Sequence, residues 1–236
     1  MIILHGFGRA FGLPDPSPFV VKTEVLLKLA GLDYSRAEGN LGKAPKGKLP
    51  FIDDDGTIVA DSTLIRLHLE KTRGIDFDKG LTPEQKGVAW AFEKLLEDHL
   101  YWIVMHERWM DPANFDRGPR KFFDKVPAPL RPIVVAMVKR QVKGNLRAQG
   151  LGRHTADERA QLVVRAIDGL AAYLGDKRWL MGDEPCGADA TVFAFVSSGL
   201  CPLFEGAVRT RLEQHKNVIA YRDRGMKLWY ADLETA

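Results

Sequence analysis

Short apolar runs alternate with helical spacing over the first third of the chain. Residues 2–4 predict a buried strand, and a loop rich in glycine and proline follows over residues 6–18. Helical spacing then covers about residues 19–30, with Ser17-Pro18 supplying the N-cap and the first helical position. We expect a second strand near residues 34–38.

A β-hairpin signal comes next. Residues 49–52 and 57–60 predict two strands, joined by the turn sequence Asp54-Asp55-Gly56. Asp61-Ser62 caps a further helix, which ends near Arg73-Gly74. The order, β-α-β and then β-β-α, predicts a small α/β domain.

Helical signals fill the remainder of the chain. Thr82 and Thr155 each open a capping box, and the helix after Gly187-Ala188-Asp189 is apolar nearly all round, which predicts burial. The apolar residues of the helix that follows Thr82 are expected on one face: Val88, Phe92, Leu95, Leu96 and Ile103. The sequence therefore predicts an α/β domain over residues 1–76 and an all-α domain over residues 82–236.

Composition excludes several classes of protein. Of the 236 residues, 45% are hydrophobic and 28% are charged, which is typical of a globular protein and not of a disordered one. The longest apolar run, residues 133–138, is too short to span a membrane, and the N-terminal residues lack the features of a secretory signal. Two cysteines, Cys186 and Cys201, cannot form a disulfide framework. We therefore expect a cytoplasmic protein.

The net charge of +3 is unevenly distributed. Residues 1–80 carry 11 basic and 11 acidic side chains, whereas residues 117–153 carry ten basic side chains and a single acidic one. Residues 130–149 combine an apolar face with a basic row, formed by Ile133, Met137, Val142 and Leu146 and by Lys139, Lys143 and Arg147. This helix is either a solvated surface helix or one that binds an anionic membrane or an acidic partner. Nucleic acid binding is not expected, because the helix has no interleaved aromatic residues.

Two helix N-termini are the first candidate binding sites. Gly6-Phe7-Gly8 and Gly12 lack the spacing of a dinucleotide-binding loop, so that class of protein is excluded. The helix starts at Ser17 and at Asp61-Ser62 offer N–H groups and a partial positive charge, which suit a thiolate or a carboxylate. Taken singly, each of these residues is better explained as a helix cap.

In combination with a third segment, these residues resemble a known family. Ser17-Pro18-Phe19, Lys48-Leu49-Pro50-Phe51-Ile52 and Ala60-Asp61-Ser62 are similar to the thioredoxin-fold domain of glutathione transferases. The resemblance continues through Gly182-Asp183-Glu184-Pro185 to residues 216–221, so it covers nearly the whole chain.

One later motif resembles a subgroup of that family. Gly150-Leu151-Gly152-Arg153-His154-Thr155, with the wide insert before it, is similar to the failed-axon-connections subgroup, which is related to metaxins. The chain departs from the family pattern at Cys186, where a serine or threonine usually caps the helix that contains Ala188-Asp189.

The resemblance implies a thiol-activating role for Ser17. Its side chain would hydrogen-bond the sulfur of glutathione and help to hold it as the reactive thiolate. The backbone of Leu49, presented by a cis Pro50, would pair with the cysteinyl segment as an added strand does. Residues 1–80 contain no cysteine, so the thiol-exchange chemistry of the cysteine-bearing members is not expected.

The resemblance also assigns residues to the two ends of glutathione. Ser62 would take the γ-glutamyl carboxylate, and Asp61 would take the ammonium group beside it. Lys48 would meet the glycyl carboxylate, although Lys46 is nearly as well placed. Glutathione is then a substrate, and no metal is implied.

The helical half must supply the acceptor site. His99 and His106 lie on the predicted apolar stripe, seven residues apart, which is too far for one metal ion without other ligands. The two histidines are either hydrogen-bonded core residues, or His106 faces the cleft with Arg108 and Trp109 and contacts the electrophile.

We therefore expect a cytoplasmic, homodimeric glutathione transferase that conjugates glutathione to small apolar electrophiles in detoxification. The alternatives are a catalytically silent scaffold or membrane-associated protein, as the metaxin-like relatives suggest, and a protein that binds glutathione without turnover. The intact set of Ser17, Leu49-Pro50 and Asp61-Ser62 favours the enzyme, whereas the basic insert favours the scaffold.

Overall fold

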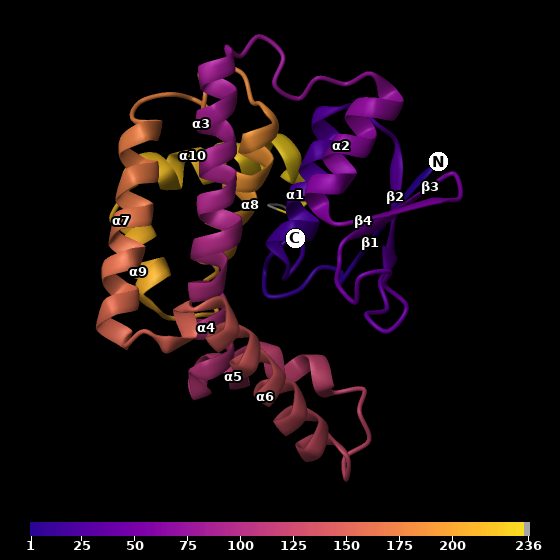
Figure 1. Ribbon diagram of the computed structural model, residues 1–236, viewed down its shortest axis with the longest axis vertical. Coiled ribbons are helices and arrows are strands. Elements are labelled where there is room, and N and C mark those ends of the chain that lie inside the picture. Colours follow the sequence, from indigo (N-terminus) through magenta and orange to yellow (C-terminus); the bar gives the residue numbers. More distant parts are fainter. Residues whose placement is uncertain (234–236) are drawn as a thin grey trace.

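The computed structural model describes residues 1–233 and confirms a thioredoxin-like α/β region followed by an all-α region (Figure 1). The last three residues of the predicted second domain lie outside the described residues. Four strands form one mixed sheet in the order β2-β1-β3-β4, in which only β1 and β2 are parallel among the described strands. The strands are β1 (Ile2–Gly6), β2 (Tyr34–Glu38), β3 (Phe51–Asp54) and β4 (Thr57–Ala60). Helices α1 (Pro18–Leu29) and α2 (Ser62–Arg73) lie between this sheet and the other helices (Figure 1).

The β3–β4 hairpin forms as its turn sequence predicts. Asp55 and Gly56 have φ values of 50° and 90°, in the left-handed region that aspartate and glycine tolerate better than most residues. β3 begins at Phe51 and not at residue 49, because Pro50 has no N–H group to donate to the sheet. The Leu49–Pro50 peptide bond is cis, as the family resemblance implies.

Both predicted capping boxes are present in the helical region, one at Thr82 and the other at Thr155. Its longer helices are α3 (Pro83–Lys94), α4 (Tyr101–Met110), α6 (Arg131–Gln149), α7 (Ala156–Leu174), α8 (Gly187–Gly199) and α10 (Lys216–Trp229). Shorter elements lie between them: η1 (Leu95–Leu100), α5 (Pro112–Arg117), η2 (Pro119–Phe123), η3 (Leu151–Arg153) and α9 (Ala207–Glu213). A further short helix, η4 (Ala231–Leu233), follows α10.

Helix α8 lies at the centre of the core. Its residues from Gly187 to Ser198 are buried, as its apolar sequence predicts. It packs against α1, α3 and α10. One hydrophobic cluster therefore runs from the sheet, through α1, into the helical region.

The helix that follows Thr82 is not uniform, in contrast to the prediction. After α3 the chain forms a π-helical stretch, η1, before α-helical geometry resumes in α4. A π-helical turn holds more residues than an α-helical turn, so it rotates the faces of α4 relative to those of α3. Val88 and Phe92 before the stretch are half-buried, whereas Ile103 after it is fully buried. The π-helical stretch was not predicted, but Leu96 and Ile103 lie in the core and Phe92 and Leu95 pack against it, as the apolar spacing predicts.

The basic insert forms an arm. Helices α5 and α6 extend away from the remaining helices (Figure 1), and much of α6 is exposed to solvent. Within residues 1–233, no helix combines the length and the apolar character that a membrane span requires.

Candidate active site

A cavity of about 720 Å³ lies where the loops of the sheet region meet α3, α4, α6 and α8. Most of the residues proposed from sequence line it: Ser17, Lys46, Lys48, Leu49, Pro50, Asp61, Ser62, Arg108 and Trp109. Chain segments that are far apart in the sequence therefore converge on one site.

Ser17 stands at the N-terminus of α1 with extended backbone angles, as an N-cap residue does. Its carbonyl oxygen accepts the N–H groups of Val20 and Val21. Its hydroxyl, however, forms no capping hydrogen bond, so the prediction that this side chain caps the helix is wrong. The hydroxyl of a half-buried serine beside the cavity is therefore free to bind a ligand.

The second helix start uses its two residues differently. The exposed carboxylate of Asp61 accepts hydrogen bonds from the N–H groups of Thr63 (3.0 Å) and Leu64 (3.3 Å), so it caps α2. Ser62 is 3% exposed and follows it at the first position of α2. The positive end of the α2 dipole thus adjoins the cavity, where it favours an anionic group.

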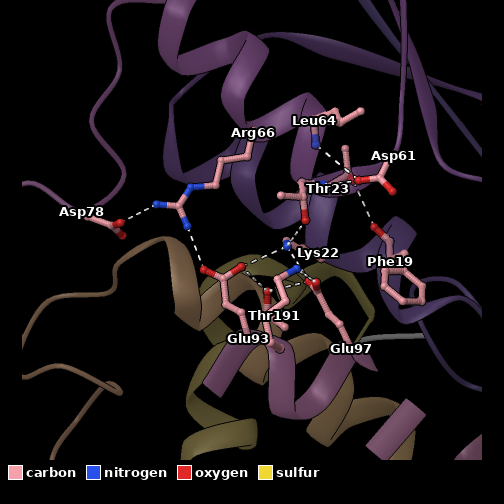
Figure 2. Close-up of polar contacts among 12 residues, drawn as sticks. Phe19, Lys22, Thr23, Asp61, Leu64, Arg66, Asp78, Glu93, Glu97 and Thr191 are labelled. Carbon is pink, nitrogen blue, oxygen red and sulfur yellow. Dashed lines mark hydrogen bonds and ion pairs between the residues drawn. The ribbon is translucent and has the colours of Figure 1, made fainter. Parts of the chain in front are cut away.

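A buried network of charges joins the sheet region to the helical region beneath these two helix starts (Figure 2). The ammonium group of Lys22, on α1, is 3.0 Å from a carboxylate oxygen of Glu93 and 2.5 Å from one of Glu97. Lys94 lies 2.5 Å from the other oxygen of Glu97, and both of these residues line the cavity.

The network extends away from the cavity through Arg66 of α2. Its guanidinium group contacts Glu93 (2.9 Å), Asp78 (2.6 Å) and Glu70 (2.9 Å), and these carboxylates raise its pKa. Sequence reasoning missed this network. The only signal in the sequence is the spacing of Glu93 and Glu97, four residues apart beside apolar positions.

Aromatic rings form the other wall of the cavity. The ring of Phe11 lies 5.6 Å from that of Phe122 and 5.5 Å from that of Phe204, and Phe7 lies 6.0 Å from Phe122. All four line the cavity, as does Trp109. An apolar molecule fits this wall. The phenylalanines were not predicted, although two of them stand four residues apart in the glycine-rich loop at the start of the chain.

His106 is not among the residues that line the cavity, in contrast to the prediction. It lies near Arg159 of α7, and burial together with this positive charge lowers the pKa of His106. His99 is also half-buried, and burial together with the neighbouring His154 lowers its pKa. Neither ring forms a hydrogen bond within residues 1–233, so hydrogen-bonded core histidines are also a wrong expectation. The π-helical stretch between α3 and α4 changes which faces of these helices meet the cavity.

The donor groups of the cavity suit an anionic organic ligand. Among residues 1–233, no group of three His, Cys, Asp or Glu side chains is placed to hold a metal ion. The cavity instead combines a free hydroxyl, a helix N-terminus and lysine side chains with an apolar wall. Such a site can hold a polar, charged molecule at one end and an apolar one at the other.

Comparisons with known proteins agree with this geometry. Residues 18–114 match the family model of the glutathione S-transferase N-terminal domain, and residues 163–225 match that of the C-terminal domain. The chain is 31% identical over 201 residues to isoprene-epoxide--glutathione S-transferase of Rhodococcus sp. (strain AD45), covering 82% of this chain and 84% of that protein. It is 31% identical over 207 residues to Failed axon connections of Drosophila melanogaster, covering 84% of this chain and 50% of that protein.

Solved structures share the same fold. The crystal structure of the β-etherase LigF from Sphingobium sp. strain SYK-6 superposes with a TM-score of 0.66 at 17% sequence identity, covering 100% of this chain and 99% of that one. At this identity the likeness concerns the fold alone. Together with the family models and the two relatives, it leads to one conclusion: the chain belongs to the glutathione S-transferase family.

Proposed function

We propose that the protein is a glutathione transferase, which joins the glutathione thiolate to small apolar electrophiles, and that Ser17 stabilises the thiolate. The observation that carries the proposal is that Ser17 lines the same cavity as Asp61-Ser62 while its hydroxyl forms no hydrogen bond that caps α1. The proposal includes a cytoplasmic homodimer that acts in detoxification, as the family resemblance implies.

Glutathione would lie across the two helix starts. In this proposal Ser62 and the N-terminus of α2 receive the γ-glutamyl carboxylate, because a hydroxyl and a positive dipole end both favour an anion. Asp61 takes the γ-glutamyl ammonium group with the carboxylate oxygen that does not cap α2. The backbone of Leu49 pairs with the cysteinyl segment, and Lys48 or Lys46 pairs with the glycyl carboxylate.

The sulfur would then lie at the start of α1. The Ser17 hydroxyl donates a hydrogen bond to it, and this bond is stronger to the thiolate than to the thiol because it gains from the negative charge. The proton leaves to solvent when the thiol ionises. Stabilising the thiolate in this way lowers the thiol pKa and raises the fraction of the reactive species at neutral pH.

The apolar wall supports a small apolar electrophile, and a relative suggests its chemical class. The Rhodococcus relative is named for an epoxide, and we propose an epoxide as the electrophile here as well. The sulfur of the thiolate attacks an epoxide carbon, so one C–S bond forms and one C–O bond breaks. The resulting alkoxide takes a proton from water, and the product is a hydroxy thioether.

The proposal is tested by binding and by product formation. Calorimetric titration should show that glutathione binds, and that cysteinylglycine, which lacks the γ-glutamyl group, binds more weakly. Incubation with glutathione and styrene oxide should yield a thioether whose mass is the sum of the two reactants. If glutathione does not bind, the proposed function is wrong.

A catalytically silent, membrane-associated scaffold is the second candidate, and the surface of α6 favours it. On a helical wheel Ile133 and Met137 lie on one side, next to Arg140, Lys143 and Arg147. Ile133 is 59% exposed and Met137 is 65% exposed. Within residues 1–233 the three basic side chains have no acidic partner, so this face suits an anionic lipid surface.

A further inference from the structure

The peptide group that joins Pro16 to Ser17 is hydrogen-bonded at both of its ends. The carboxylate of Asp15 accepts the N–H of Ser17 at 3.0 Å. The guanidinium group of Arg108 donates to the carbonyl oxygen of Pro16 at 3.3 Å. Because a peptide group is planar, two bonds at opposite ends fix the orientation of the whole plane. This peptide group leads directly into Ser17, which lines the cavity.

Asp15 is built into the loop and is only 1% exposed. Its other carboxylate oxygen accepts the N–H groups of Phe7 and Gly8, each at 3.0 Å, and lies 3.2 Å from the guanidinium group of Arg36. Four donors thus surround one buried carboxylate. Such an arrangement holds the loop between β1 and α1 in one conformation.

Arg108 reaches the same peptide group from the helical region. It lies on α4, is 7% exposed, and also donates to the carbonyl oxygen (2.7 Å) and the hydroxyl (2.9 Å) of Ser198 on α8. Its guanidinium group stacks over the ring of Phe204, 4.4 Å from the centroid. Within residues 1–233 it forms no ion pair with a carboxylate. A buried arginine without an acidic partner is costly, which indicates that the contact has a function.

We propose that Asp15 and Arg108 are positioning residues that hold Ser17 in the orientation that stabilises the glutathione thiolate. The proposal rests on the proposed function. Since the Ser17 side chain forms no capping bond, its direction depends on the backbone that carries it. The two hydrogen bonds define that backbone, one from within the loop and one from α4. Assembly of the helical region against the loop thereby completes the thiol site.

The amide hydrogen of Ser17 is a direct probe of this arrangement. Ser17 stands between Pro16 and Pro18, so its amide is the only one in the three-residue segment. Its exchange with solvent deuterium reports on the hydrogen bond to Asp15, and NMR can measure it without glutathione. The thiol pKa of bound glutathione, followed by the ultraviolet absorbance of the thiolate, then reports on the role in catalysis.

Two variants and one control test the proposal. Asp15→Asn leaves a single acceptor oxygen, and Arg108→Gln shortens the side chain and removes its charge. If Arg108→Gln does not fold, Arg108→Lys takes its place. The lysine keeps the charge but has no planar group that can hydrogen-bond Pro16 and Ser198 at the same time. The matched control is Arg209→Gln, because Arg209 also donates to a proline carbonyl but lies outside the cavity.

We expect exchange of the Ser17 amide to quicken by about tenfold or more in both the Asp15 and the Arg108 variants, and not in the Arg209 control. The thiol pKa of bound glutathione should rise by about one unit, with little change in glutathione affinity. Wild-type exchange, or faster exchange with an unchanged thiol pKa, would overturn the proposal. If wild-type protein does not bind glutathione, the proposed function fails, and the positioning role for thiolate chemistry fails with it, whatever the exchange result.

Discussion

The ammonium group of Lys22 lies 2.5 Å from a carboxylate oxygen of Glu97, and both side chains are almost completely buried. Lys22 belongs to α1 and Glu97 to the π-helical stretch between α3 and α4, so this contact joins the sheet region to the helical region. Glu93 takes part in the same contact at 3.0 Å (Figure 2). The pair lies beneath the N-terminus of α2, and Glu97 borders the cavity.

Removing the charge of Lys22 should destabilise the protein strongly. In Lys22→Met the carboxylates of Glu93 and Glu97 lose their shared cation. Each keeps one other cation, Arg66 for Glu93 and Lys94 for Glu97, so the loss should be at most the roughly 3–5 kcal/mol that removing one partner of a buried ion pair typically costs. The control is Lys71→Met, an exposed lysine of α2, which should change the free energy of unfolding by no more than about 0.5 kcal/mol. Urea unfolding measures both values. A loss below about 1 kcal/mol in Lys22→Met would contradict the role given to this network.

Glu107 should make stability depend on pH. Burial raises the pKa of its carboxyl group from 4.5 to about 7. Between these values the folded state holds the proton and the unfolded state releases it, so this group lowers the free energy of unfolding as pH rises, and its effect levels off once the pH has passed the folded pKa of about 7. The difference in free energy of unfolding between wild type and Glu107→Gln should therefore fall from pH 5 to pH 7, by at most about 1.4 kcal/mol per pH unit. A difference that is constant across this range would refute the assignment.

The local sequence predicts the turns and helix caps of the sheet region, but it does not predict the buried contacts beside the cavity. The turn at Asp55-Gly56 and the caps at Asp61 and Thr82 depend on neighbouring residues, so the sequence alone predicts them. Lys22 offers no such signal, because a lysine in a helix is usually exposed and only the packing of α1 against α8 and α2 buries it.

His106 of α4 illustrates a second limit. The sequence predicts the placement of His106 from regular α-helical spacing, and the π-helical stretch upstream alters that spacing.

Asp15 shows a third limit. A single aspartate in a loop resembles any turn residue, and its contacts with Ser17 and Arg36 depend on how the loop folds back.

Ser62 should affect the binding of glutathione more than its turnover. The γ-glutamyl group is remote from the sulfur and does not change as bonds form, so Ser62→Ala should weaken the ground state and the transition state alike. Loss of a hydrogen bond to a charged group, worth about 1.5–3 kcal/mol, should raise KM for glutathione by roughly tenfold or more, with kcat within about twofold. Steady-state kinetics measures both parameters, and Ser35→Ala, which changes an exposed serine of β2, is the control that should leave both unchanged. A large fall in kcat with little change in KM for Ser62→Ala would show instead that Ser62 acts in the chemical step.

The exposed face of α6 should bind anionic vesicles if the second candidate function holds. Cosedimentation with phosphatidylserine vesicles should then weaken steeply between low and physiological salt, because exposed charges are screened. Replacing Arg140 and Lys143 with glutamine should reduce binding, whereas replacing Lys216 and Lys227 on α10 should not. Absence of binding at low salt would remove the membrane form of this candidate.

The thiol pKa of bound glutathione in wild type and in Ser17→Ala tests the central claim most directly. The Ser17 hydroxyl forms no capping bond, so the alanine variant should fold with a loss below the roughly 1 kcal/mol that a cap usually contributes. Loss of a charge-assisted hydrogen bond of about 1.5–3 kcal/mol should raise the thiol pKa by about 1–2 units. Turnover near neutral pH should fall about tenfold or more, while glutathione affinity changes less. A folded variant with an unchanged thiol pKa and wild-type turnover would contradict the account, and Ser17 would have no part in the chemistry.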